Sequence, residues 1–343
     1  MDEHHSQPLL EVKDLYRYFE VGRSLPWSRF SLVKAVNGVS FSIQKGQTLG
    51  LVGESGCGKS TLARLVLQIL EPTSGRIIFE GQDITGIKGK DWSHMRLRMQ
   101  MIFQDPLGSL DPRMTIGQQL VEPLKAHGLG TDKRLRDQAE SALAQVGLRS
   151  DSLEKYPHQL SGGMRQRVVA ARALALSPSL LICDEPVSAL DVSIQAQAVN
   201  LLQDLQRDHG LTYLFISHDL RVVRHISHRV AIMYLGRLVE IAPAETIFSA
   251  ARHPYTRALI SAVPLPDPAN SRSREFLQGE PPSPIDKPPG CAFHPRCRFS
   301  QPLCRREEPE LETIAGNHLA ACHLAEQFDS QAREDYARHF ASR

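Results

Sequence analysis

A glycine-rich segment contains the first residues whose types and spacing suit a chemical task. Residues 53–60 read GESGCGKS, which fits the pattern G-x-x-x-x-G-K-[ST] at every fixed position. The apolar run QTLGLV precedes it and the periodic run STLARLVLQIL follows, so we expect a strand, a loop and a helix in that order. Glycines let successive backbone N–H groups turn inward around an anion, and the helix N-terminus adds positive charge. The segment therefore predicts a phosphate-binding loop.

The lysine and serine of this loop have distinct expected tasks. Lys59 brings a full charge to the β- and γ-phosphates of ATP, and Ser60 is a natural Mg²⁺ ligand. Cys57 fills a free position of the motif, and its thiol is expected to take no part in the chemistry. The residues expected to line the nucleotide here are Gly53, Glu54, Ser55, Gly56, Cys57, Gly58, Lys59, Ser60 and Thr61.

Two adjacent carboxylates end another apolar run, LLICDE, at residues 180–185. Asp184 is placed to hold Mg²⁺, directly or through water, and Glu185 to accept a proton from the water that attacks the γ-phosphate, or to orient it. Such a pair alone is often a solvated strand end. Together with a phosphate-binding loop, it predicts nucleotide hydrolysis.

A third segment, LSGGMRQ at residues 160–166, indicates which class of nucleotide-hydrolysing protein to expect. Its SGG begins at Ser161, 23 residues before Asp184, and this spacing leaves room for one helix and a return to a sheet. Here the sequence closely resembles the nucleotide-binding subunits of ABC transporters, whose signature motif begins LSGG. The resemblance implies that Ser161, Gly162 and Gly163 close over the γ-phosphate of ATP bound to another subunit. A hydroxyl, two N–H groups and a helix N-terminus suit that task, so a head-to-tail dimer is expected.

Further positions take their roles from the same resemblance. Gln104, in IFQDP, corresponds to the glutamine that touches Mg²⁺ or the attacking water and borders the membrane subunits. His218, in FISHDL, corresponds to the histidine that bonds the γ-phosphate, and Asp191, in SALD, to the loop that crosses to the dimer partner. Phe19 is the expected adenine-stacking residue, with Tyr18 as the alternative. Met164, where many relatives carry Gln, is expected to leave activity intact.

The elements that position these residues alternate between strand and helix patterns. Short apolar runs separated by helix-length stretches indicate an α/β domain with a parallel sheet. The resemblance implies an ABC-type P-loop NTPase domain with a RecA-like α/β core, a β subdomain and a helical signature subdomain. Strands are expected at 49–52, 101–103, 180–183 and 213–216, helices at 132–146 and 161–176, and β-rich flanks at 33–43 and 229–241, the latter with a hairpin at 235–236.

Composition sets outer limits on the function. The chain has 343 residues, 23% charged and 41% hydrophobic, with a formal net charge of +2, so a folded protein without a broad nucleic-acid face is expected. The polar, acidic start is unlike a secretory signal, and the sequence has no apolar run long enough for a membrane span. These features indicate the cytoplasm, and the resemblance implies a peripheral position on the cytoplasmic face of the inner membrane, which the chain would contact through other subunits.

Proline content divides the chain. Residues 264–290 are rich in proline and poor in apolar residues, which is typical of a linker. We therefore expect a nucleotide-binding domain at 1–263, a linker at 264–290 and a small irregular cysteine-rich extension at 291–343.

Four of the six cysteines lie in that extension, at Cys291, Cys297, Cys304 and Cys322. Their spacing, C-x5-C-x6-C-x17-C, contains no C-x-x-C pair, and the wide intervals suit a cluster larger than one ion. Zinc and four unligated thiols stay open as alternatives. His294, His318 and His323 are near enough in sequence to be substitute ligands.

Segments outside the common motifs point to a subfamily. Residues 24–41, 251–264 and 279–297 resemble the dipeptide and oligopeptide importer ATPases, which carry a [4Fe–4S] cluster in the cysteine segment. The resemblance implies a translocase-type ATPase with a homologous second ATPase subunit, two membrane permeases and an external or periplasmic substrate-binding protein, and no nucleic acid. Nickel or glutathione import and a non-transport ABC ATPase are the alternatives.

Overall fold

The computed structural model describes residues 7–22, 31–104, 108–188, 191–263 and 279–328. Its centre is an eight-stranded sheet in the order β11-β12-β10-β9-β3-β8-β7-β6. The strands β9, β3, β8, β7 and β6 are parallel neighbours, which confirms the predicted parallel sheet. The strands of this sheet are β3 (Thr48–Val52), β6 (Met99–Ile102), β7 (Leu180–Asp184), β8 (Thr212–Ile216), β9 (Arg229–Tyr234), β10 (Arg237–Pro243), β11 (Glu312–Ala315) and β12 (His318–Ala320).

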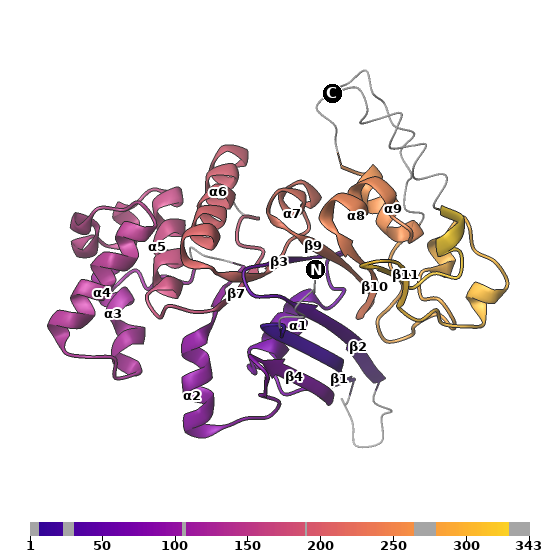
Figure 1. Ribbon diagram of the computed structural model, residues 1–343, viewed down its shortest axis with the longest axis horizontal. Helices are drawn as coiled ribbons and strands as arrows, with labels where there is room; N and C mark the ends of the chain where they lie inside the picture. Colours follow the sequence, from indigo (N-terminus) through magenta and orange to yellow (C-terminus); the bar gives the residue numbers. More distant parts are fainter. Residues whose placement is uncertain (1–6, 23–30, 105–107, 189–190, 264–278, 329–343) are drawn as a thin grey trace, which may run out of the picture.

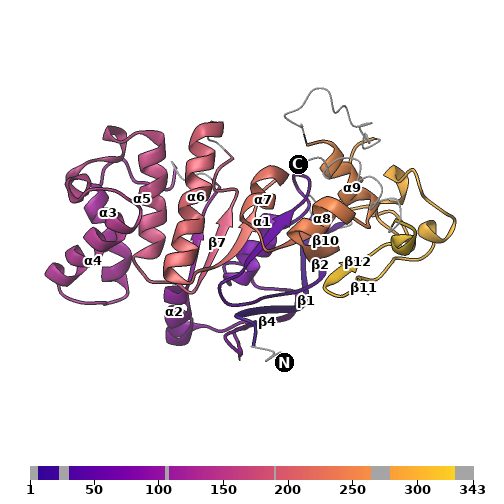
Figure 2. The same ribbon diagram turned by 45° about the horizontal axis from the view of Figure 1, so that its top comes forward.

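A second, antiparallel sheet has the order β2-β1-β4-β5. It is formed by β1 (Leu10–Val21), β2 (Ser31–Ile43), β4 (Ser74–Phe79) and β5 (Gln82–Asp83). The two predicted β-rich flanks therefore separate: residues 33–43 lie in this small sheet, whereas 229–241 form the β9–β10 hairpin of the central one. Figures 1 and 2 show the small sheet and α1 (Lys59–Val66) on one face of the central sheet.

Helices cover the opposite face and one end of the molecule. In both views α6 to α9 lie over the central sheet, and α3, α4 and α5 form a separate helical part beyond α6 (Figure 2). The helices are α2 (Gly89–Arg98), α3 (Ile116–Ala126), α4 (Asp132–Gln145), α5 (Gly162–Leu174), α6 (Val192–His209), α7 (Leu220–Ile226), α8 (Ala244–Ala250) and α9 (Pro254–Ser261), with short 3-10 turns at 150–154, 157–159, 294–296, 303–305 and 325–327. Among the described residues, no helix is both long and apolar enough to cross a membrane.

The central strands are buried on both faces because their apolar residues alternate between two cores. Leu181 and Cys183 of β7 pack in the core under α5 to α9, whereas Leu180 and Ile182 pack in the core around α1 and the small sheet. Burial on both faces explains why these strands have continuous apolar sequences. The sheet therefore holds the loops at its strand ends on a rigid support.

The cysteine segment is less irregular than predicted. Its β11–β12 hairpin extends the central sheet, since β12 pairs with β10 at Glu240↔Ala320 and Ile241↔Leu319. Glu240 is fully buried, and its carboxylate accepts the backbone N–H groups of Arg252 at 2.6 Å and His253 at 3.0 Å. His318 Nε2 lies 2.7 Å from the same carboxylate. A buried polar cluster therefore joins the extension to the end of the nucleotide-binding part.

Candidate functional site

The predicted phosphate-binding loop joins β3 to α1. Two of its glycines are required by close approach: a Cβ at Gly53 would lie 2.2 Å from the Met233 carbonyl oxygen, and one at Gly58 would lie 2.2 Å from that of Ala35. Gly58 also has a φ of +112°, which L side chains rarely adopt. The loop is therefore packed tightly between the β9–β10 hairpin and β2.

Lys59 and Ser60 begin α1 and face two different sets of oxygens. The Lys59 ammonium is buried and donates to the carbonyl oxygens of Gly53 at 2.7 Å and Glu54 at 3.0 Å, so it lies inside the loop. The Ser60 hydroxyl lies 3.1 Å from Asp184 Oδ1. Burial raises the pKa of the Asp184 carboxyl, and the Ser60 hydrogen bond opposes that rise. A hydroxyl and a desolvated carboxylate are oxygen donors that suit Mg²⁺.

Glu185 follows Asp184 and collects two polar side chains from neighbouring strand ends. Gln104 Nε2 donates to Glu185 Oε2 at 3.3 Å, and His218 Nδ1 lies 3.2 Å from the same oxygen. The Glu185 backbone has a φ of +49°, a rare conformation for a residue with a Cβ, and its N–H donates to the Ile216 carbonyl oxygen at 2.9 Å. The structure thus brings together three residues that are far apart in the sequence.

The signature residues 161–163 lie apart from the phosphate-binding loop of their own chain. Ser161 is the N-cap of α5 and accepts the Met164 N–H at 3.4 Å, so the predicted SGG stands at a helix N-terminus. In Figures 1 and 2, α5 lies beyond α6 and β7 from α1. Gln166 of α5 donates to the Pro186 carbonyl oxygen at 3.0 Å, which ties the signature helix to the loop after Glu185.

Asp191 and the aromatic residues of β1 are less directly connected to the loop. Asp191 caps α6 by accepting the Ile194 N–H at 3.0 Å. The Arg17 guanidinium lies over the Phe19 ring, 4.6 Å from its centroid, whereas the Tyr18 hydroxyl donates to Asn37 Oδ1 at 2.7 Å. Both aromatic rings are partly exposed, and the choice of Phe19 for adenine stacking stays a prediction.

The four extension cysteines carry free thiols. Burial, with smaller contributions from the thiols of Cys291, Cys297 and Cys304, raises the pKa of Cys322 to about 12. Cys291 also donates its backbone N–H to the Cys304 carbonyl oxygen at 2.8 Å. In the described part of the chain, no group of three or more His, Cys, Asp or Glu side chains is arranged to hold a metal ion.

Two further residues contact the phosphate-binding loop and were not singled out in the sequence. The Tyr255 hydroxyl of α9 accepts the Glu54 N–H at 2.9 Å, and the Arg296 guanidinium, between two of the cysteines, binds the Glu54 carboxylate. Neither residue lies in a motif, and both are more than 200 positions from Glu54. Local sequence patterns therefore contain no signal for them.

Comparison with known proteins agrees with this geometry. The ABC transporter family matches residues 36–188, and the C-terminal region of oligopeptide/dipeptide transporters matches residues 239–304. A probable peptide ABC transporter ATP-binding protein of Sinorhizobium fredii is 50% identical over 93% of this chain and 90% of its own. The oligopeptide transport ATP-binding protein AppF of Bacillus subtilis is 48% identical over 93% of this chain and 98% of its own.

Solved structures share the fold of the nucleotide-binding part. The ATP-binding cassette MJ0796, in a dimeric post-hydrolysis state bound to ADP and Pi, has a TM-score of 0.60 and 25% identity and covers 68% of this chain and 98% of its own. The ABC transporter protein cbiO1 of Clostridium perfringens also has a TM-score of 0.60, with 27% identity over 71% of this chain and 91% of its own. The chain therefore belongs to the ATP-binding proteins of the ABC transporter family, in the group that carries the oligopeptide/dipeptide transporter C-terminal region.

Proposed function

We propose that this chain is the ATP-hydrolysing subunit that powers import of dipeptides or oligopeptides. The observation that carries the proposal is the convergence of Gln104, Asp184, Glu185 and His218 at one edge of the sheet. They lie at or just after the carboxyl ends of the parallel strands β6, β7 and β8, beside the loop that follows β3. In open parallel sheets this edge is where ligands bind.

The proposed hydrolysis uses each side chain for one task. The loop N–H groups and Lys59 bind the phosphates, and Glu185 accepts a proton from the attacking water. His218 and Gln104 contact the Glu185 carboxylate at 3.2 and 3.3 Å, and from there His218 is assigned to bond the γ-phosphate and Gln104 to touch Mg²⁺ or the attacking water. Ser60 and Asp184 would hold Mg²⁺, which when bound supplies positive charge to the phosphate oxygens.

A second ATPase subunit completes the proposed site. Ser161, Gly162 and Gly163 stand at the start of α5, away from the phosphate-binding loop of their own chain, so we assign them to ATP on a partner, with Asp191 at the crossing loop. The MJ0796 cassette bound to ADP and Pi is itself a dimer. We propose a heterodimer with a homologous subunit. Analytical ultracentrifugation of this chain alone, and then with that subunit and ATP, tests the choice between homodimer and heterodimer.

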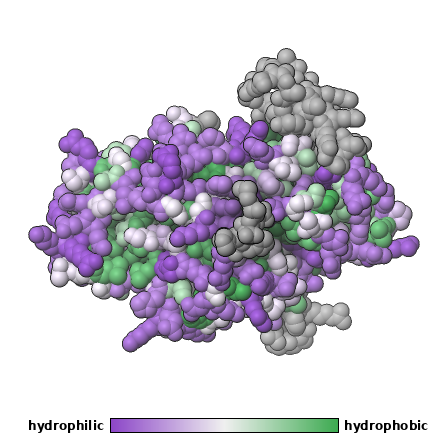
Figure 3. Space-filling view, in the orientation of Figure 1, coloured by the Kyte–Doolittle hydropathy of each residue, from purple (hydrophilic) through white to green (hydrophobic). Residues whose placement is uncertain are grey.

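We propose that this chain contacts two membrane permeases from the cytoplasmic face of the inner membrane. An external or periplasmic substrate-binding protein is the proposed further partner in the complex. Phe103, 45% exposed, precedes Gln104, and Tyr156, 38% exposed, lies near the start of α5. Hydrophobic residues also gather on the left of the face in Figure 3, where α3 and α4 lie, on an otherwise largely hydrophilic surface. Phe103 adjoins the hydrolytic residue Gln104 in the sequence, and these apolar side chains are suited to a contact with the permeases.

Transport and co-purification test the function. A strain that lacks this chain should lose uptake of peptides and regain it with the unmodified chain, but not with a Lys59→Ala variant. Nickel and glutathione, included in the same panel, separate the alternative importers. Isolation of the tagged chain without integral membrane proteins would favour a non-transport ABC ATPase instead.

We further propose that Cys291, Cys297, Cys304 and Cys322 hold a [4Fe–4S] cluster, with zinc as the alternative, in an extension at 291–343 joined through 264–290 to a domain at 1–263. The supporting observation is that four free, mutually interacting thiols are partly or fully buried. Thiolates formed by these cysteines would need a positive partner. Four thiolates are the usual ligand set of such a cluster.

Anaerobic purification tests the cluster directly. We expect about four iron atoms per chain and a broad absorbance at about 400 nm. One zinc per chain without iron would establish the alternative, and a chain that holds neither metal would carry four free thiols.

A further inference from the structure

The loop between β3 and α1 contains one acidic side chain, Glu54, in a place built for phosphate. Its carboxylate is bound by both terminal nitrogens of Arg296: Nη1 lies 2.7 Å from Oε2 and Nη2 lies 3.0 Å from Oε1. This two-bond geometry is the strongest that arginine and a carboxylate form. The Arg296 side chain is 5% exposed and that of Glu54 is 24% exposed, so solvent screens the pair only weakly.

Arg296 is positioned by the cysteine turn, defined as residues 291–297. Within this turn His294 donates its N–H to the Cys291 carbonyl oxygen at 2.9 Å, and Arg296 donates its N–H to that of Phe293 at 3.0 Å. The guanidinium therefore reaches Glu54 only when the turn has this shape.

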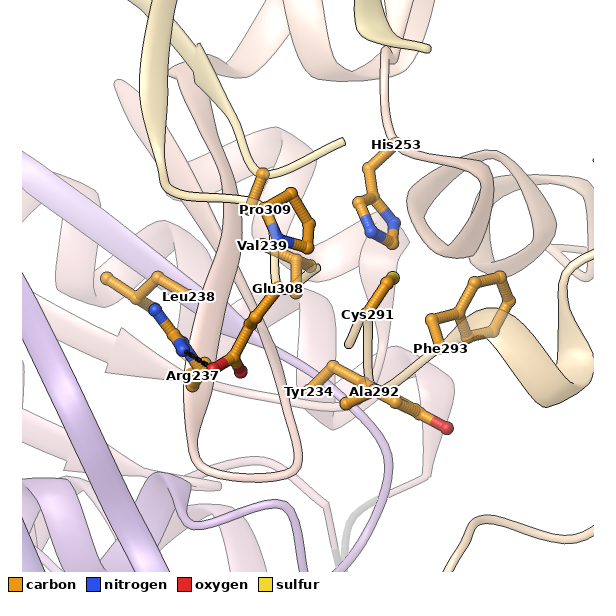
Figure 4. A pocket seen from close by; sticks show the side chains of 11 residues that line it. Tyr234, Arg237, Leu238, Val239, His253, Cys291, Ala292, Phe293, Glu308 and Pro309 are labelled. Carbon is orange, nitrogen blue, oxygen red and sulfur yellow. Dashed lines mark ion pairs between the residues drawn. The ribbon is translucent and has the colours of Figure 1, made fainter. Parts of the chain in front are cut away.

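The cysteine turn is itself packed against the nucleotide-binding part. Phe293 is buried, with its ring centroid 5.4 Å from those of both Tyr234 and Tyr255. Figure 4 shows Cys291, Ala292 and Phe293 facing the β9–β10 hairpin around a small pocket, beside the ion pair of Arg237 with Glu308. The turn, the hairpin and the loop thus form one packed unit.

The charge of Glu54 explains why the loop needs Arg296. Without a partner, a carboxylate beside the bound phosphates would repel them, and its side chain would be free to rotate into the loop. The same residue also fixes the backbone, because its N–H is held by Tyr255 and its carbonyl oxygen by Lys59. The Arg296 guanidinium both neutralises this carboxylate and holds it away from the bound phosphates.

We propose that Arg296 is a positioning residue of the nucleotide site, which neutralises the Glu54 carboxylate and holds it away from the bound phosphates while the cysteine turn is folded against the hairpin. This inference rests on the proposed function, because it assumes that the loop binds ATP. It makes the C-terminal extension part of the nucleotide site rather than an appendage.

The test is a double-mutant cycle in the full-length chain, with Glu54→Gln as the second single variant, read as the Kd of MgATP by calorimetry. Arg296→Ala should raise that Kd at least about tenfold, and more at low salt than at high salt. Adding Glu54→Gln to Arg296→Ala should restore the Kd to within about threefold of the unmodified value, because the amide does not repel phosphate. The Kd of Arg296→Lys should lie between those of Arg296→Ala and the unmodified chain. An ammonium keeps the charge but does not form two parallel bonds with the carboxylate.

Hydrolysis by the assembled complex gives the second readout. Arg296→Ala should raise the KM for ATP while kcat at saturating ATP stays within about twofold, since Arg296 does not touch the hydrolytic residues. Arg306→Ala, an exposed arginine of the same segment, is the matched control and should change neither constant.

The outcomes separate the two proposals. An unmodified chain that does not bind MgATP would contradict the proposed function itself. An unchanged Kd in Arg296→Ala, or a double variant that binds as weakly as the single one, would overturn the role of Arg296. If Arg296→Ala does not fold, Arg296→Lys decides: a Kd raised at least about threefold supports the inference, and an unchanged Kd refutes it.

Discussion

Replacing Glu185 by glutamine is the sharpest perturbation of the proposed chemistry. The amide has nearly the size of the carboxylate and keeps a carbonyl oxygen for one of the contacts from Gln104 and His218, at 3.3 and 3.2 Å in the unmodified chain. What it loses is the ability to accept a proton. The fold and ATP binding should therefore persist while hydrolysis slows.

The expected magnitude follows from the task assigned to Glu185. A positioned general base contributes about 10² to 10⁴ in rate, which corresponds to roughly 3 to 5 kcal/mol of transition-state stabilisation. Glu185→Asp keeps the charge but withdraws the carboxylate by about one C–C bond, roughly 1.5 Å. Both contacts would then exceed hydrogen-bonding distance, so this variant should retain an intermediate rate.

The assay is single-turnover phosphate release from the assembled complex at saturating MgATP, with the Kd of MgATP measured in parallel. Glu154→Gln, in an exposed ion pair with Arg136 at 2.7 Å, is the control for loss of one carboxylate and should leave the rate unchanged. A Glu185→Gln rate within about threefold of the unmodified one would refute the assignment of the base.

Three other predictions concern metal affinity, the loop and acid stability. Ser60→Ala, which removes the hydroxyl at 3.1 Å from Asp184, should raise the Mg²⁺ concentration for half-maximal hydrolysis about tenfold, as a magnesium titration would show. Tyr255→Phe keeps the buried ring but removes the acceptor of the Glu54 N–H, and should lower the free energy of unfolding by about 1 to 3 kcal/mol in denaturant titrations. Burial lowers the pKa of His253 to about 4, below its ordinary 6.5, so the unfolded chain binds the extra proton first as pH falls. Neutral, buried His253 therefore contributes its full stabilisation, at most roughly 3 kcal/mol, above about pH 6.5. This stabilisation is lost as the pH falls towards 4. His253→Asn, which can still accept the Tyr255 N–H, should remove that part of the pH dependence, and an unchanged pH profile would contradict it.

Local chemistry explains which features the sequence could predict. The strand, loop and helix around 53–60 are adjacent in the chain, so glycine spacing and apolar periodicity were sufficient to predict them. The strands at 49–52, 180–183 and 213–216 and the helix at 132–146 were confirmed to within two residues at each end, because buried parallel strands and helices have strong patterns.

Contacts between distant segments were decided by the tertiary structure. The extension was predicted as irregular, yet its β11–β12 hairpin completes the edge of the central sheet at β10. Only two residue pairs of β12 register with β10, and a strand so short has no clear pattern in the sequence. The buried acceptor Glu240, which binds this hairpin through His318, looks like any charged residue of a strand.

Sequence motifs alone predict the chemistry proposed for this protein, because the phosphate-binding loop, the paired carboxylates and the signature segment each consist of contiguous residues. The folded chain alone shows how these motifs are brought together. It placed Gln104 and His218 on the same carboxylate oxygen of Glu185, and it brought Arg296 to Glu54 across 242 positions. Such contacts depend on how sheet edges and packed aromatic rings bring distant segments together, which no local pattern encodes.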